Sequence, residues 1–188
     1  MRLLIKKTGI IFLCLALFIF FDLSSKLFVK SHMERNRPVS LVKGFVRLIY
    51  IENPGGMLGF GEDQSDTVKF WVLIAGVSIV IAFLIIYLLV KKRSNRIQEA
   101  GLLMIAAGGA GNLIDRVFNN GRVIDFILIG FKSFHTAVFN FADLFIFIGS
   151  VLFILSRVTT KKATTNEIDS NRGIQNDPIS IQKKERDM

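Results

Sequence analysis

Four apolar stretches separated by polar segments make up most of the chain. They cover residues 10–29, 70–90, 100–117 and 139–155. Each is close to the length of about 20 residues that a helix needs to cross the hydrocarbon core of a bilayer. The pattern therefore predicts an all-α membrane protein with four transmembrane helices.

The polar segment at 31–69, between the first two stretches, has its own pattern. Residues 45–51 are rich in aromatic and β-branched side chains, which predicts a short strand or hairpin. Asn53-Pro54-Gly55-Gly56 is a turn sequence, and the apolar patch at 57–60 either dips into the lipid interface or lines a site. We therefore expect a small extracytoplasmic segment that contains β-structure.

The loop after the second stretch indicates the orientation of the chain. It contains Lys91, Lys92, Arg93 and Arg96 and no acidic residue, which is typical of a cytoplasmic loop. With four spans, both termini are then cytoplasmic. The membrane domain is expected at 1–157, and residues 158–188, which are polar and low in aromatics, are expected to form a disordered cytoplasmic tail.

A cleaved signal peptide is an alternative interpretation of the first stretch. The stretch has no small-x-small cleavage site, and its far end carries Asp22 and Lys26 in helical register. We interpret it as an uncleaved first span. The two charges are one turn apart, so they form either a simple ion pair or a functional contact.

Composition narrows the function classes. The chain is 51% hydrophobic with a net charge of +9, but its cations lie in short groups beside apolar runs, which does not indicate nucleic-acid binding. The single cysteine, Cys14, allows no intramolecular disulfide, and His32 and His135 do not have the spacing of zinc ligands. We expect neither a metal nor a cofactor.

Polar residues in three of the spans fall at one depth. With the predicted topology, all of them lie near the outer leaflet, at the late ends of the first and third spans and the early end of the fourth. These residues are Asp22, Lys26, Asn112, Asp115, Arg116, Asn140 and Asp143. Such a coincidence of depth predicts a shared site.

The chemistry of that site has several possible interpretations. Two carboxylates in a partly dry pocket share a proton and can hydrolyse a peptide bond without a metal. A proton or cation carrier is the main alternative, although it usually needs polar residues through the full depth and an internal repeat. A non-catalytic scaffold is the third, and a serine mechanism with Ser133 and His135 is disfavoured because the chain has no GxSxG motif.

Asp115 has two possible roles. It is either a third acid or a structural carboxylate paired with the adjacent Arg116. We favour the structural role, because a neighbouring cation favours the ionised form and opposes proton sharing.

The chain resembles the lipoprotein signal peptidase family, also called signal peptidase II, over about residues 10–155. Five stretches together give the resemblance, namely 22–26, 53–60, 108–116 (Gly-Gly-Ala-Gly-Asn-Leu-Ile-Asp-Arg), 123–126 (Val-Ile-Asp-Phe) and 139–143 (Phe-Asn-Phe-Ala-Asp). The resemblance implies that Asp125 and Asp143 are the catalytic aspartates. It also implies that Asn53, Gly55, Asn112, Arg116 and Asn140 bind substrate, with Asp22, Lys26 and Asp115 in supporting roles.

The resemblance further implies a reaction and a location. The enzyme would be an intramembrane aspartyl endopeptidase of the bacterial cytoplasmic membrane, active near the outer leaflet. It would remove the signal peptide of a prolipoprotein by cleaving before a diacylglyceryl-modified cysteine. Membrane lipids as partners and inhibition by the cyclic peptide globomycin are also implied.

Two stretches depart from the family pattern. Leu23 follows Asp22 where glutamine is usual, and Asn53-Pro54-Gly55-Gly56-Met57-Leu58-Gly59 replaces Asn-Thr-Gly-Ala-Ala-Phe-Gly. Both affect the expected shape of the pocket but leave the aspartate pair intact.

Overall fold

The computed structural model describes residues 2–56, 61–91, 95–131 and 134–175, with only the backbone at 2–5 and 160–175. The apolar patch predicted at 57–60 therefore lies outside the described residues. The elements in chain order are α1 (Arg2–His32), β1 (Val39–Val42), β2 (Val46–Asn53), α2 (Asp66–Lys69), η2 (Phe70–Gly76), α3 (Val77–Val90), α4 (Arg96–Phe118), β3 (Val123–Phe131), β4 (Phe134–His135) and α5 (Phe141–Gln175).

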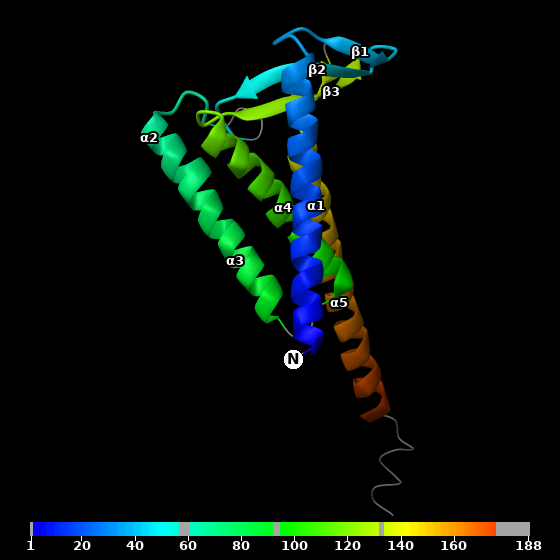
Figure 1. Cartoon of the computed structure of the whole chain (residues 1–188). Coiled ribbons are helices and arrows are strands. Elements are labelled where there is room, and N and C mark those ends of the chain that lie inside the picture. The colour runs from blue at the N-terminus through cyan, green and yellow to red at the C-terminus, as the bar shows by residue number, and fades with distance from the viewer. Residues whose placement is uncertain (1, 57–60, 92–94, 132–133, 176–188) are drawn as a thin grey trace, which may run out of the picture.

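Four helical spans confirm the predicted fold class. By length and composition, Lys6–His32, Asp66–Val90, Arg96–Phe118 and Phe141–Thr159 could each cross a membrane. Their ends differ by a few residues from the predicted ones. In Figure 1 the helices run side by side, and the strands lie across one end of them.

The last helix is longer than expected. We expected a disordered tail from residue 158, but the backbone of α5 continues to Gln175. No glycine or proline interrupts the sequence between Gly149 and Gly173, so nothing in this polar segment terminates the helix. The structure describes nothing beyond Gln175.

The distribution of side chains is the reverse of that in a soluble protein. Large apolar side chains such as Phe20, Ile79 and Phe83 are exposed, whereas Lys26 and Asn140 are fully buried. In water the exposed apolar area would be unfavourable, whereas in lipid it is not. The helices thus present apolar faces to the bilayer and enclose their polar groups.

Helix α4 lies at the centre of the bundle and contacts α1, α3 and α5. Its small residues allow the close approach to α5. A Cβ added at Gly101 would lie 2.6 Å from the carbonyl oxygen of Gly149, and one at Gly108 would collide with the carbonyl oxygen of Ala142. Interfaces of small residues are typical of membrane helices that pack backbone to backbone.

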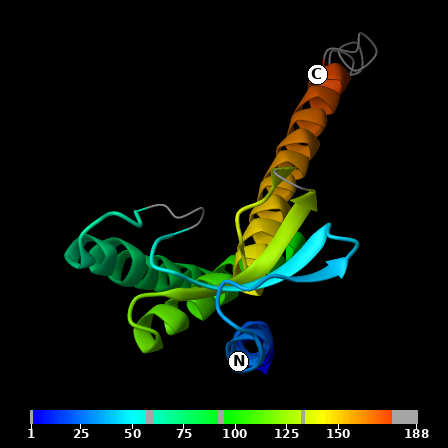
Figure 2. The ribbon, with the colours of Figure 1, turned by 90° about the horizontal axis from the view of Figure 1, so that it is seen from above.

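The strands form one antiparallel sheet in the order β1-β2-β3-β4. Seen from above in Figure 2, β1, β2 and β3 lie side by side over the end of the helices. The strand predicted at 45–51 is confirmed as β2, with β1 as its hairpin partner. Sequence reasoning did not predict β3, in which Asp125 lies opposite Ile51 of β2.

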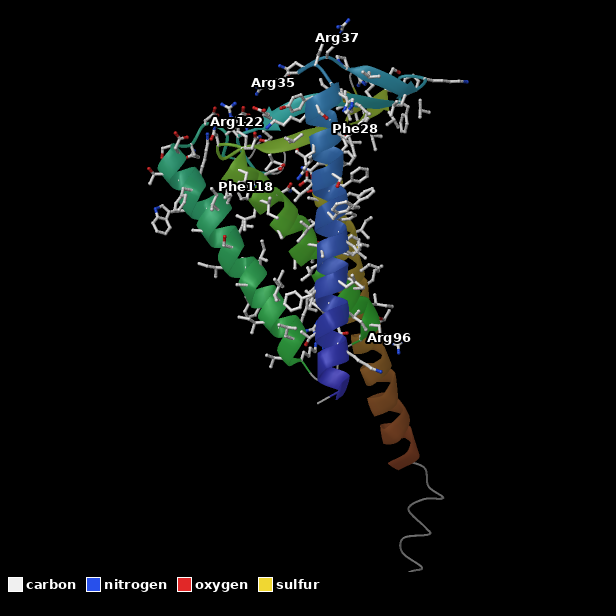
Figure 3. All side chains as sticks on the ribbon, viewed as in Figure 1. Phe28, Arg35, Arg37, Arg96, Phe118 and Arg122 are labelled. Carbon is white, nitrogen blue, oxygen red and sulfur yellow. The ribbon has the colours of Figure 1, made fainter. Side chains whose placement is uncertain are left out.

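Basic residues mark both ends of the molecule. Figure 3 shows Arg35, Arg37 and Arg122 at the end with the sheet and Arg96 at the opposite end. At that opposite end Lys7 forms an ion pair of 2.8 Å with Glu99, so the N-terminal part of α1 and the start of α4 lie together. The sheet and the loop after α3 therefore lie at opposite ends of the bundle.

Candidate active site

Asp125 lies at the start of β3, where the strand is buried on both faces. Its carboxylate is 3% exposed. Asn53 Nδ2 donates to Oδ2 over 3.0 Å, and Asn140 Nδ2 donates to Oδ1 over 2.7 Å. The register of β2 and β3 explains the first contact, because Asn53 pairs with Val123 and is thereby diagonal to Asp125 on the same face.

Asp143 lies in the first turn of α5, where the helix dipole favours a carboxylate. Asn112 Nδ2 of α4 donates to its Oδ1 over 2.9 Å, and the backbone N–H of Asn140 donates to its Oδ2 over 3.3 Å. In return, the backbone N–H of Asp143 donates to Asn140 Oδ1 over 2.9 Å. This reciprocal pair closes the start of α5 as a capping box does.

Asn140 therefore connects Asp125 and Asp143, the two aspartates that the resemblance implies are catalytic, and we call them the catalytic pair on that expectation. Its side chain is completely buried. Its amide group donates to Asp125 and its carbonyl oxygen accepts from the backbone of Asp143. A buried polar side chain with all of these contacts satisfied is held in one orientation.

Both members of the catalytic pair line a single cavity of about 640 Å³. Its polar wall also contains Asn53, Asn112 and Arg116. Its apolar wall comes from α3, α4, α5, β3, the segment before α5, and η2, a π-helical part of the second span. Among the described residues this wall consists of Leu73, Val77, Gly109, Val123, Ile129, Ala137, Val138, Phe139, Leu144, Ile146 and Phe147.

Burial changes the proton affinity of Asp125. Removal from water, together with the nearby charge of Asp143, raises its pKa to about 7, although the hydrogen bonds from Asn53 and Asn140 oppose the rise. Near neutral pH this carboxyl group is thus poised between its acid and its base form. Such a group is suited to proton transfer.

A buried charged cluster lies beside the catalytic pair, and we call it the Lys26 cluster (Asp22, Lys26, Asn112 and Asp115). Lys26 Nζ lies 2.7 Å from Asp22 Oδ2, 3.2 Å from Asp115 Oδ2 and 2.8 Å from Asn112 Oδ1. The structure thus shows the predicted pairing of Asp22 with Lys26. The partner expected for Asp115 was wrong, because it pairs with Lys26 and not with Arg116.

The two carboxylates of this cluster also bind backbone. Asp22 Oδ1 accepts from Ala142 N at the start of α5 over 2.8 Å, and Asp115 Oδ2 accepts from Ile124 N of β3 over 3.0 Å. The cluster therefore joins α1, α4, β3 and α5 around the site. In this respect the supporting role expected for Asp22, Lys26 and Asp115 matches their contacts.

Arg116 connects α4 to the turn after β2. It donates to Gly55 O over 2.8 Å and to Asn112 O over 3.3 Å. Asn53 Oδ1 accepts from Gly55 N over 2.8 Å, which closes the turn. Gly55 thus takes part through its backbone, and neither Gly55 nor Asn140 lines the cavity.

Sequence reasoning placed all ten site residues in this region, and the structure brings them together. It missed the cavity wall from the second span, whose residues Leu73 of η2 and Val77 of α3 have no polar signal in the sequence. It also missed the backbone donors Ile124 and Ala142. Over the described residues no three His, Cys, Asp or Glu side chains group together as metal ligands could, and Ser133 lies outside that part of the chain.

Comparison with known proteins agrees with this arrangement. The family model for signal peptidase (SPase) II matches residues 14–159. The chain belongs to the signal peptidase II family. Signal peptidase II is a protease, so the protein is a hydrolase that acts on peptide bonds, and it is a multi-pass protein of the bacterial inner membrane.

Several curated relatives of this signal peptidase II carry the name lipoprotein signal peptidase. The one from Syntrophus aciditrophicus is 32% identical over 159 residues, which are 84% of this chain and 98% of the relative. The one from Buchnera aphidicola is 41% identical over 110 residues, or 58% and 69% of the two chains. A solved bacterial membrane enzyme is 25% identical with a TM-score of 0.70, covering 84% of this chain and 91% of the other.

Proposed function

We propose that this signal peptidase II removes signal peptides from prolipoproteins by cleaving before a diacylglyceryl-modified cysteine, with Asp125 and Asp143 as its catalytic residues. One observation supports the assignment of Asp125 and Asp143. Both carboxylates line one cavity whose remaining wall is mostly apolar. A lipid-modified peptide needs both features in one place, because its acyl chains require apolar surface while its scissile bond requires acid and base.

The two aspartates have different roles in this proposal. Asp125 is the more buried, and its raised pKa keeps it protonated over much of the acidic and neutral range. It therefore serves as the acid that polarises the scissile carbonyl. Asp143, which accepts two hydrogen bonds at a helix N-terminus, serves as the base.

The proton transfers follow from these roles. Asp143 takes a proton from a water molecule, whose oxygen attacks the carbonyl carbon, while Asp125 donates its proton to the carbonyl oxygen and a gem-diol forms. Asp143 then gives its proton to the amide nitrogen as the carbon–nitrogen bond breaks, and Asp125 recovers its proton from the diol. The products are a signal peptide with a free carboxyl group and a lipoprotein with a free α-amino group on its cysteine.

The substrate contacts divide into two groups. Asn53, Asn112 and Arg116 line the cavity and can reach a bound peptide. Gly55 accepts a hydrogen bond from Arg116, and Asn140 is bonded to both members of the catalytic pair. Both residues therefore support the cavity wall without lining it. In this proposal Asn53, Asn112 and Arg116 bind substrate directly, whereas Gly55 and Asn140 contribute indirectly.

The position in the membrane follows from the two ends of the bundle. Lys91 and Arg96 flank the short loop at the end away from the sheet, which favours a cytoplasmic location for that end and for both termini. The cavity, at the end with β3, then lies near the outer leaflet. Lipid acyl chains are partners there, and the cyclic peptide globomycin is expected to compete for the cavity.

Incubation of the purified protein with a diacylglyceryl-modified precursor tests the proposal. Asp125→Asn and Asp143→Asn should each abolish cleavage while the variants still insert and accumulate. Asp66→Asn, in an exposed first turn of α2, is the matched control and should cleave normally. Cleavage by either variant of the catalytic pair at the normal rate, or equal cleavage of an unmodified precursor, would contradict the proposal.

A further inference from the structure

Lys26 is the largest side chain that the structure buries completely, with an exposed fraction of 1%. An ammonium group has three protons to donate. Asp22, Asp115 and Asn112 provide one acceptor each, at 2.7, 3.2 and 2.8 Å. All three donors are therefore used, and Lys26 is not among the residues that line the cavity.

Of the three contacts of Lys26, the one with Asn112 also determines how the amide of Asn112 is oriented. An ammonium can only donate, so the atom of Asn112 that faces Lys26 must be the carbonyl oxygen. Asn140 Nδ2 donates to the same oxygen over 3.1 Å. Two donors thus fix the orientation of this amide.

That orientation decides what Asp143 receives. With Oδ1 turned to Lys26, the amide NH₂ of Asn112 points to Asp143 Oδ1 at 2.9 Å. The reverse orientation would place two donors against each other at Lys26 and two oxygens against each other at Asp143. The charge of Lys26 excludes it, because the ammonium cannot accept a hydrogen bond.

We propose that Lys26 is a positioning residue of the catalytic site, which fixes the amide of Asn112 so that its NH₂ group holds the carboxylate of Asp143 in place. This inference rests on the proposed function of the catalytic pair. Lys26 does not touch substrate and acts through Asn112. The fixed charges around Asp143 are Lys26 and Asp22 on α1, Asp115 and Arg116 on α4, and Asp125 on β3.

A simple structural role for Lys26 makes different predictions. If it only tied α1 to α4, its loss would lower stability without changing the kcat of the folded protein. A second lysine–asparagine pair between the same helices provides the control. Lys30 Nζ donates to Asn119 Oδ1 over 2.9 Å, but this pair is exposed and makes no contact with the catalytic pair.

The test compares Lys26→Met, Asn112→Asp and Lys30→Met in the full-length protein, with kcat and KM measured on the lipid-modified precursor. Lys26→Met should lower kcat about 100-fold and change KM little, because Asp143 is no longer held in place while the cavity wall is intact. Lys30→Met should leave both kcat and KM unchanged.

Asn112→Asp keeps the test decisive if Lys26→Met fails to fold. This substitution preserves an oxygen acceptor for Lys26, but it replaces the NH₂ donor to Asp143 with an oxygen and adds a negative charge beside it. It should lower kcat at least as much as Lys26→Met and change KM little. In addition, Lys26→Met should add little to the defect of Asn112→Ala, because both remove the same hydrogen bond from Asp143.

Three outcomes would overturn the inference: an unchanged kcat in Asn112→Asp, an equal loss of kcat in Lys30→Met, or additive defects in the double variant. These are distinguishable from failure of the proposed function. If Asp125→Asn and Asp143→Asn are inactive while the Lys26 variants keep the normal kcat, only the role of Lys26 is wrong. If either aspartate variant cleaves normally, the catalytic assignment itself is wrong.

Discussion

Asn140 donates a hydrogen bond of 2.7 Å from its side-chain amide to the carboxylate of Asp125. The same side chain accepts from the backbone of Asp143. A single asparagine thus sets the spacing of two acids that belong to a strand and a helix. The relative position of the catalytic pair therefore depends on the buried side chain of Asn140 as well as on the packing of β3 and α5.

Asn140→Ala is expected to lower kcat about 100-fold, because both aspartates lose the group that orients them. Asn140→Asp should be equally impaired at neutral pH, since a third carboxylate would repel the other two. Steady-state cleavage of the lipid-modified precursor measures both. Activity within threefold of the unmodified protein would show that Asn140 does not orient the pair.

The pH dependence of the reaction should show the raised pKa of Asp125, which is about 7. The acid form of Asp125 is the active one in the proposed mechanism. It is lost as the pH rises through that value, so kcat should fall about tenfold per pH unit on the alkaline side. Profiles from about pH 5 to about pH 9 would detect this limb.

Asn53→Ala tests whether Asp125 causes the fall of kcat at alkaline pH. The hydrogen bond from Asn53 lowers the pKa of Asp125, so its removal should raise the pKa and move the alkaline limb to higher pH. A limb that stays in place, or moves to lower pH, would mean that Asp125 is not the group that titrates.

Arg116→Lys should lower kcat/KM about 10- to 100-fold. The guanidinium donates to Gly55 O and Asn112 O at the same time, and a lysine amine does not reproduce this fork. Arg122→Lys is the matched control, because Arg122 is half exposed and forms a 3.3 Å ion pair with Glu52. Equal losses in the two variants would argue against a specific role for Arg116.

Gly101→Ala should destabilise the bundle by about 1–3 kcal/mol, because the added methyl group would lie 2.6 Å from the carbonyl oxygen of Gly149. Gly9→Ala provides the comparison, since a Cβ at Gly9 has no neighbour within 4 Å. Thermal unfolding in detergent should show a lower Tm for the first variant only. A similar Tm for both would mean that α4 and α5 can move apart at no cost.

The four spans, and the gathering of the polar residues at one end of them, could be predicted from the sequence, because hydropathy and helix length are local properties. The choice of Asp125 and Asp143 has a different basis, namely the resemblance of the stretches around them. The position of Asp125 in a strand was missed because β3 pairs with β2 some 70 residues away. Strand pairing over such a separation depends on the placement of the helices between them.

The partner of Asp115 shows more clearly what could not be predicted from the sequence. Its sequence neighbour Arg116 was the natural choice, but adjacent residues on a helix point in different directions. Which residue of another helix faces Asp115 depends on how both helices are rotated. Only the packed structure shows that Lys26, from the first span, fills that position.

The hydrogen bond from Ala142 N to Asp22 Oδ1 links the beginning of the last span to the first span. During synthesis the first span is made before the other three and the last span after them. A nascent chain that has inserted three spans therefore has an acceptor on α1 without its donor, and it lacks Asp143 altogether. In the proposed mechanism such a chain has no base and cannot cleave, so activity would begin only after the final helix docks.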